Sequence, residues 1–126
     1  MSSAVRILPY DAQYAPLFDQ LNRAWIEEYF VMEPLDEMVL MQPEAHIVAT
    51  GGEIWFAALH DDVVGACALL PHKEGMFEFT KLGVSERARG HGVAKALLRH
   101  SAVRAKERGA HTLRIFTSTK LEIGRA

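Results

Sequence analysis

The chain has 126 residues, of which 49% are hydrophobic and 24% charged, values typical of one folded soluble domain. Its longest apolar runs fall well short of the roughly 20 residues that a membrane span requires. The N-terminus also lacks the basic and apolar regions of a secretory signal. A single cysteine, Cys67, cannot form an internal disulfide, so we expect a cytoplasmic protein with no membrane partner.

Charge is distributed unevenly along the chain. Residues 1–63 carry two basic and eleven acidic side chains, a net −9, and residues 64–126 carry twelve basic and five acidic ones, a net +7. This asymmetry fits a polyanionic ligand on the basic half and a cationic ligand on the acidic half, and it fits two solvated surfaces equally well. An isoelectric point of about 6.3 argues against a nucleic-acid partner.

The first third of the chain predicts one strand and two helices. An apolar run over residues 5–8, ended by a proline, is typical of a strand. Apolar residues at helical spacing then predict a helix from Asp11, its candidate N-cap, to about Phe30. A second, short helix is expected between Pro34 and Pro43.

The middle of the chain predicts three strands. Two apolar runs, Ile54–Leu59 and Val63–Leu70, flank a polar turn at residues 60–62 and predict a β-hairpin. A turn at residues 71–75 leads into a third strand over Met76–Val84.

The last elements are a helix and a strand. Val93 to about Glu107 has one apolar and one basic face and predicts a helix that ends at Gly109, before a strand over Leu113–Phe116. The whole order predicts an α/β protein with a mixed, mostly antiparallel central sheet flanked by helices, formed by residues 1–126 as a single domain.

A glycine-containing loop joins the predicted strand over Met76–Val84 to the predicted helix that begins at Val93. Gly90 and Gly92 lie directly before that helix, whose first amides lack internal partners, so the loop can cradle a pyrophosphate. Arg87, Arg89 and Lys95 add positive charge there. Lys95 occupies the position of the third glycine of a dinucleotide fingerprint, and the Gly-Lys-Ser/Thr of a P-loop is absent. On the loop alone, an ordinary tight turn remains the more common interpretation.

The sequence Arg-Ala-Arg-Gly-His-Gly at residues 87–92 resembles the Arg/Gln-x-x-Gly-x-Gly/Ala signature of GNAT-type N-acetyltransferases. The resemblance extends upstream through residues 78–84 and downstream through residues 94–98 and 113–118. The resemblance is strong over about residues 54–121. Before residue 54 it is limited to the order of the predicted helices and strands. It implies an acyl-CoA N-acyltransferase-like fold and direct transfer of an acetyl group from acetyl-CoA to a primary amine, without a metal.

The same resemblance implies which residues bind coenzyme A. The backbone of Leu82, Gly83 and Val84 would pair with the pantetheine arm, and the amide of Val84 is a candidate to polarise the thioester carbonyl and stabilise the oxyanion. A glycine at position 83 indicates a bulge or a close backbone approach. The residues implied to hold the pyrophosphate are Arg87, Arg89, Gly90, His91, Gly92, Val93, Ala94 and Lys95.

An amine acceptor, small molecule or peptide, must lose a proton before it attacks, because an alkylammonium has a pKa of about 10.4. Glu78 is the first candidate for that base, acting through water, and the alternative is a structural or solvent-facing carboxylate. The amine would approach from the acidic first half, near residues 25–30. No histidine spacing indicates a metal site, and Cys67 is interpreted as a core residue.

Members of this family usually continue past the last strand with a helix and two strands, whereas here residues 117–121 resemble the start of that helix and the sequence ends soon after. The missing helix commonly supplies a tyrosine that protonates the thiolate, and Tyr10, Tyr14 and Tyr29 lie elsewhere. We therefore expect one of two situations: the domain is naturally short and a second copy covers its last strand in a homodimer, or the chain is a shortened, C-terminally incomplete product of a longer one. The alternatives are a weak or inactive CoA-binding or sensing module, and a subunit whose edge strand completes another protein.

Overall fold

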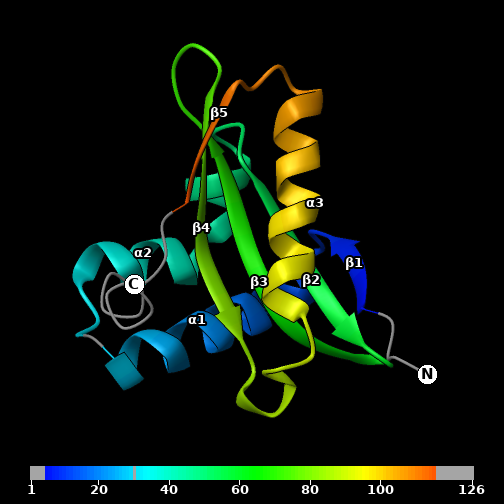
Figure 1. Ribbon diagram of the computed structural model, residues 1–126. Helices are drawn as coiled ribbons and strands as arrows, with labels where there is room; N and C mark the ends of the chain where they lie inside the picture. Colours follow the sequence, from blue (N-terminus) through cyan, green and yellow to red (C-terminus); the bar gives the residue numbers. More distant parts are fainter. Residues whose placement is uncertain (1–4, 30, 116–126) are drawn as a thin grey trace.

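The computed structural model of the protein describes residues 5–29 and 31–115. A five-stranded sheet with the order β1-β2-β3-β4-β5 forms its centre (Figure 1). Its first four strands are antiparallel neighbours, and β5 lies parallel to β4, which confirms the expected mixed, mostly antiparallel sheet. The strands are β1 (Val5–Pro9), β2 (Glu53–Leu59), β3 (Asp62–Pro71), β4 (Met76–Val84) and β5 (Thr112–Ile115).

Helices cover both faces of this sheet (Figure 1). One face is covered by α1 (Ala15–Tyr29), α2 (Pro34–Met41) and η2, a π-helical turn over Glu44–Val48. The other face is covered by α3 (Val93–Glu107), whose axis runs along the sheet. None of the helices in the described residues is long and apolar enough to cross a membrane.

Two hydrophobic layers hold these helices on the sheet. Phe18 of α1 and Phe56 of β2 are fully buried in the layer beneath α1 and α2. Phe79 of β4 and Leu97 lie in the layer beneath α3. Cys67 is also fully buried on this side, its Sγ is 3.5 Å from the hydroxyl oxygen of Ser101, and burial raises its pKa to about 12, as expected for a core cysteine.

The predicted element borders agree closely with the structure, with two differences. Asp11 caps a short 3-10 turn, η1 (Ala12–Tyr14), by accepting a hydrogen bond from the amide of Gln13 at 3.0 Å, and α1 follows that turn. The turn η2 was not predicted because its one fully buried side chain, Ile47, gives no periodic pattern. Phe30, Phe116 and the predicted helix start at residues 117–121 lie outside the described residues.

Candidate functional site

Strand β4 carries a bulge just before the glycine loop. Its pairing with β3 shifts between Thr80 and Gly83, so that Lys81 and Leu82 both lie opposite Cys67. Lys81 has a φ of 54°, in the left-handed region that a residue with a side chain rarely adopts. A bulge of this kind redirects the backbone groups of the strand, and bulges are frequent beside active sites.

The helix α1 packs directly on the strand next to this bulge. A Cβ atom on Gly83 would lie 2.8 Å from the carbonyl oxygen of Leu21 and 3.1 Å from the amide nitrogen of Asn22. The sequence indicated a bulge or a close approach at Gly83; the structure has the bulge immediately before it and the close approach at Gly83 itself. The Nζ of Lys81 lies 3.1 Å from Oδ1 of Asp36, which also links α2 to the bulge.

On the side of β5, strand β4 is paired over only part of its length in the described residues. Strand β5 pairs with β4 from Met76 to Phe79. Beyond that point, from Thr80 to Val84, no strand of the described residues pairs with this edge. Main-chain groups on such an edge can hydrogen-bond an extended ligand in the way that a sheet accepts an added strand.

The chain then turns sharply into α3. After a 3-10 turn, η3 (Glu86–Ala88), Gly90 and Gly92 have φ values of 87° and 80°, which glycine adopts at little cost. A Cβ on either glycine would meet no atom within 4 Å. These glycines therefore leave open space above the start of α3, which would be filled by any larger residue.

The amides of this loop fall into two groups. Three of them close the turns, because the N–H groups of Ala88, Arg89 and His91 donate to the carbonyls of Ser85, Glu86 and Ala88, respectively. Among the described residues, no hydrogen bond is found for the amides of Gly90, Gly92, Val93, Ala94 and Lys95. The Val93 side chain is buried in the core, which fixes the position of the first helical turn. The free amides therefore lie on a firmly held turn at the positive end of the helix dipole, an arrangement that can bind an anion.

The two arginines of the loop pair with acidic residues. Nη1 of Arg87 lies 3.2 Å from Oδ2 of Asp62. Nη2 of Arg89 lies 3.8 Å from Oε1 of Glu28, and its Cζ lies 4.9 Å from the ring centroid of Trp25. These contacts were not predicted, and those of Arg89 place α1 beside the loop that carries the predicted cofactor residues.

The predicted base, Glu78, lies on β4 one residue before the end of the pairing with β5. Its neighbours Phe77 and Phe79 are buried on the α3 face, so Glu78 faces the side of α1 and α2. Its Oε1 is in hydrogen-bond contact with Nε2 of His72, which the sequence did not indicate. The Glu78 side chain is 15% exposed and is thus partly shielded from solvent.

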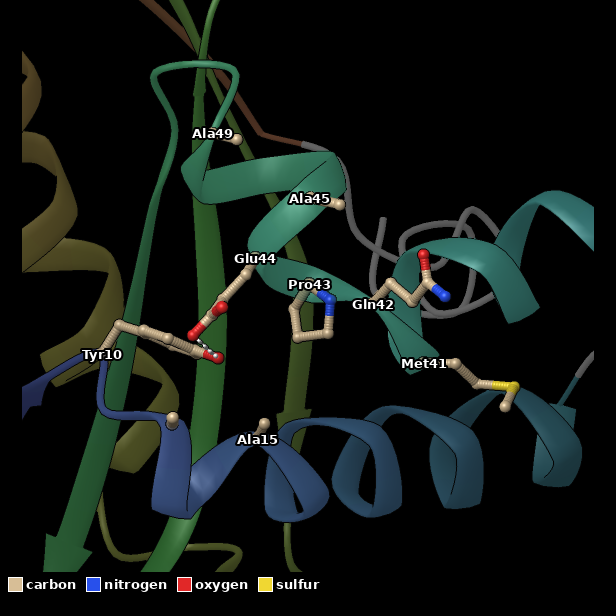
Figure 2. Close-up of a pocket in the computed structure, with 9 residues that line it drawn as sticks. Tyr10, Ala15, Met41, Gln42, Pro43, Glu44, Ala45 and Ala49 are labelled. Carbon is tan, nitrogen blue, oxygen red and sulfur yellow. Dashed lines mark hydrogen bonds between the residues drawn. The ribbon is translucent and has the colours of Figure 1, made fainter.

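A separate hollow lies at the other end of α1 (Figure 2). It has a volume of about 610 Å³, and the Tyr10 hydroxyl donates to Oε2 of Glu44 across it at 3.2 Å. Burial and the neighbouring Glu44 raise the pKa of Tyr10. None of the predicted site residues lines this hollow; its lining consists of Tyr10, Ala12, Ala15, Met41, Gln42, Pro43, Glu44, Ala45 and Ala49. Across the described ranges, no group of His, Cys, Asp and Glu side chains is placed to hold a metal ion.

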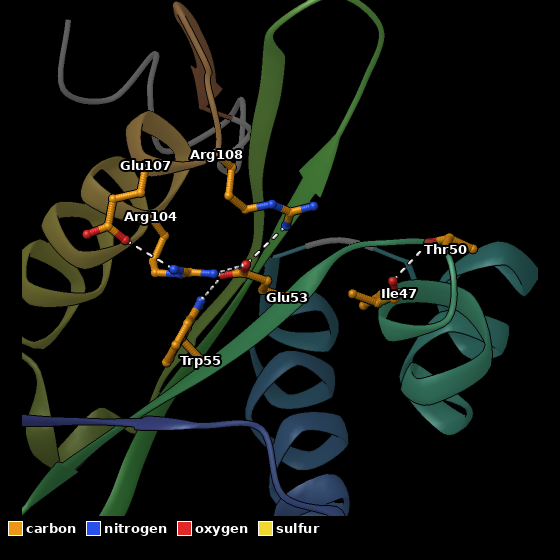
Figure 3. Close-up of polar contacts among 7 residues, drawn as sticks. All are labelled: Ile47, Thr50, Glu53, Trp55, Arg104, Glu107 and Arg108. Atoms are coloured by element: carbon orange, nitrogen blue, oxygen red, sulfur yellow. Dashed lines mark hydrogen bonds and ion pairs between the residues drawn. The ribbon is translucent and has the colours of Figure 1, made fainter.

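The far end of α3 is attached to β2 by an ionic cluster (Figure 3). Glu53 accepts hydrogen bonds from Arg104 at 2.6 and 3.0 Å, from Arg108 at 3.0 Å and from the indole nitrogen of Trp55 at 2.9 Å. Burial alone would raise the pKa of Glu53, but these hydrogen bonds and the two guanidinium charges outweigh it and lower the pKa. The cluster fixes the C-terminal end of α3, opposite to the end that carries the free amides.

With this geometry established, comparisons identify the class of protein. The model of the acetyltransferase (GNAT) family matches residues 16–122. The chain therefore belongs to the GNAT family of acetyltransferases, whose members carry out acyl-CoA-dependent acetyl transfer. A search of curated proteins gave no match.

Solved structures show the same fold. A GNAT-family acetyltransferase from Staphylococcus aureus Mu50 superimposes with a TM-score of 0.82 at 21% identity, over 97% of this chain and 78% of that one. A predicted acetyltransferase from Clostridium acetobutylicum, solved with acetyl-CoA, gives 0.72 at 17% identity, over 92% and 82%. A ribosomal-protein-alanine N-acetyltransferase from Brucella melitensis biovar Abortus 2308 gives 0.72 at 23%, over 97% and 86%.

Proposed function

We propose that this protein is an N-acetyltransferase that moves an acetyl group from acetyl-CoA to a primary amine by direct attack. One observation carries the proposal. Strand β4 has a bulge and, in the described residues, an edge that no strand pairs with beyond Phe79. It leads into an open glycine turn, and free amides line this turn and the start of α3. A ligand with an extended arm and a diphosphate fits this arrangement, because the arm can pair with the strand edge and the diphosphate can bind the amides at the helix start.

The residues present fit coenzyme A. The amides of Gly90 and Gly92, together with those of residues 93–95, hold the pyrophosphate in the space that both glycines leave open. The backbone of residues 82–84 binds the pantetheine arm along the edge of β4. Arg87, Arg89, His91 and Lys95 border the turn with exposed backbone or side chains. Acetyl-CoA, when bound, supplies a thioester whose carbonyl carbon is open to a nucleophile, and the Val84 amide is the donor proposed to face its oxygen.

Glu78 is the proposed general base. Its carboxylate removes a proton from the acceptor ammonium through a water molecule, which frees the nitrogen lone pair for attack. The acceptor, a small molecule or a peptide, reaches it from the side of α1, where Glu27 and Glu28 are exposed and attract a cation. The Brucella neighbour is a ribosomal-protein-alanine N-acetyltransferase, and we propose an acceptor of the same general class, an amine, for this chain.

The proposal also covers the extent of the domain, the compartment and the oligomeric state. Residues 1–126 act as one domain, and the buried, unpaired Cys67 suits a reducing cytoplasm. A second copy of the chain covers β5, because this strand pairs with β4 alone among the described residues and exposes Ile115. Light scattering tests the homodimer, and a monomer at high concentration contradicts it.

A second candidate function is binding of CoA without transfer. Two tyrosines are engaged elsewhere: the hydroxyl of Tyr10 donates to Glu44, and the rings of Tyr10 and Tyr14 pack on Phe56. Neither is therefore placed to protonate a departing thiolate, which favours a sensing module. A thiolate with a pKa of about 8.5 is a tolerable leaving group without such an acid, so transfer remains the first proposal.

Two measurements separate these functions. Isothermal titration with acetyl-CoA shows whether the chain binds the donor, and absence of binding refutes both. A thiol-release assay with polyamines, amino acids, aminoglycosides and peptides with free N-termini then shows whether an amine is acetylated. Binding without thiol release by any of these amines supports the sensing module.

A further inference from the structure

His72 lies at the start of a tightly held hairpin turn between β3 and β4. Its amide donates to the carbonyl of Met76 at 2.7 Å, which closes the turn. The amide of His111 donates to the carbonyl of Gly75 at 2.9 Å, and a Cβ on Gly75 would lie 2.5 Å from Nε2 of His111. The turn is thus fixed both by its own backbone and by the segment before β5, which limits where the His72 ring can lie.

The ring of His72 meets the carboxylate proposed as the base. Nε2 of His72 and Oε1 of Glu78 are in hydrogen-bond contact, with the imidazole 43% and the carboxylate 15% exposed. An ionised carboxylate accepts hydrogen bonds and cannot donate them, so Nε2 must carry the hydrogen. This donation occupies Oε1 and leaves Oε2 for a water molecule or an amine.

Other charged groups surround this pair. Arg114 is the neighbour of Glu78 on β5 in the parallel register. Lys73 and Glu74 lie in the hairpin turn, next to His72 in sequence, and His111 packs against the turn at Gly75. Within the described residues, the contact with Nε2 of His72 limits the orientation of the Glu78 carboxylate.

We propose that His72 is a positioning residue for acetyl transfer, acting through Glu78. This inference rests on the proposed function. The Nε2–H of His72 holds the carboxylate in one rotamer, so that its second oxygen faces the acceptor side of β4. A base that is free to rotate spends part of its time out of reach of the proton, and a misplacement of about 1 Å can cost on the order of 100-fold in rate.

The test compares two substitutions at this position. His72→Ala removes the donor, and kcat falls by about 10- to 100-fold while KM for acetyl-CoA stays unchanged. His72→Gln keeps an N–H near the position of Nε2 and retains most of kcat. Equal losses in both variants, or normal kcat in His72→Ala, would overturn the proposal.

The matched control is His111→Gln on the other side of the same hairpin. It keeps the backbone hydrogen bond from residue 111 to Gly75, which fixes the turn, and changes only a side chain that does not touch Glu78, so its kcat stays at the wild-type value even where its stability falls. If His111→Gln reduces kcat as much as His72→Ala, the effect belongs to the hairpin as a whole and the positioning role is refuted.

A measurement without turnover separates this inference from the proposed function. Long-range proton–nitrogen NMR of the wild type shows His72 with its hydrogen on Nε2, and Glu78→Gln shifts the signals of that ring. A ring with a hydrogen on Nδ1 and none on Nε2 would overturn the proposal even in an active enzyme. If the contact is seen but no amine is acetylated, the proposed function fails, and the catalytic role of His72 fails with it.

Discussion

The carbonyl oxygen of Leu21 in α1 lies too close to Gly83 of β4 to leave room for a side chain there. A Cβ at position 83 would lie 2.8 Å from that oxygen, closer than real Cβ atoms approach a backbone atom. The helix and the strand thus meet through their backbones, directly beside the bulge at Lys81. A glycine at position 83 is what allows α1 to lie so close to the proposed acetyl site.

Gly83→Ala is expected to lower the free energy of unfolding by about 1–3 kcal/mol, because α1 must move away from β4. Urea denaturation measures this loss. The control is Gly109→Ala, at a φ of 90° with open space around its Cβ, which introduces backbone strain of about 1 kcal/mol but no clash. Wild-type stability in Gly83→Ala would show that α1 is not seated as described.

Gly90→Val and Gly92→Val are each expected to weaken acetyl-CoA binding by at least about tenfold, since a side chain at either position enters the space above the free amides. Isothermal titration measures the affinity. Gly109→Val provides the matched control, because it places the same side chain at a positive φ after the other end of α3. The affinity of Gly109→Val for acetyl-CoA should remain unchanged. An equal loss of affinity in this variant would show that backbone strain, and not the filled space above the amides, causes the effect.

The pH dependence of stability should contain a contribution from His100. Burial lowers the pKa of His100 from the ordinary value of 6.5, so the unfolded state binds its proton at a higher pH than the folded state does. The free energy of unfolding therefore falls as the pH drops through 6.5.

His100→Phe tests this contribution, because it keeps a ring against Trp55, whose centroid lies 4.2 Å from that of the imidazole, and it does not titrate. Denaturation of both proteins at several pH values should show the variant gaining stability relative to the wild type as the solution becomes more acidic. A constant difference between pH 7.5 and 5.5 would contradict the expectation.

Glu53→Gln is expected to cost about 1.5–3 kcal/mol at neutral pH, because it leaves two arginines without their shared carboxylate. The lowered pKa of Glu53 means that its stabilisation is present above the ordinary value of 4.5 and is lost as the pH falls through the pKa of the folded state. Urea denaturation should therefore show the difference between variant and wild type shrinking in acid. Glu107→Gln serves as the control: its carboxylate is 58% exposed and contacts Arg104 at the surface, so a loss of about 0.5 kcal/mol or less is expected.

Local patterns in the sequence were sufficient to predict most of the fold. The two apolar runs around residues 60–62 predicted the β2–β3 hairpin, and the amphipathic repeat from Val93 predicted α3 with its observed borders. Both signals come from neighbouring residues, whose periodicity reflects the layer in which they are buried. The family match then confirmed the class of protein that the glycine signature had suggested.

The contacts that tune the site could not be predicted in the same way. His72 meets Glu78 across a hairpin turn, and Arg89 meets Trp25 and Glu28 from a distant helix. Each contact depends on tertiary packing and on the choice of rotamer, neither of which leaves a repeat in the sequence. Gly83 indicated a bulge or a close backbone approach, but the left-handed residue of the bulge is Lys81, which has no special propensity for that conformation.

The ionic cluster around Glu53 has a consequence for how such a protein can change over time. It secures α3 to β2 at the end remote from the glycine turn, where the side chains of His91 and Lys95 are exposed. Substitutions of these two exposed side chains are therefore expected to cost little folding stability, so they can accumulate while the fold is kept. One helix in this way separates the residues that preserve the fold from those that selection can vary.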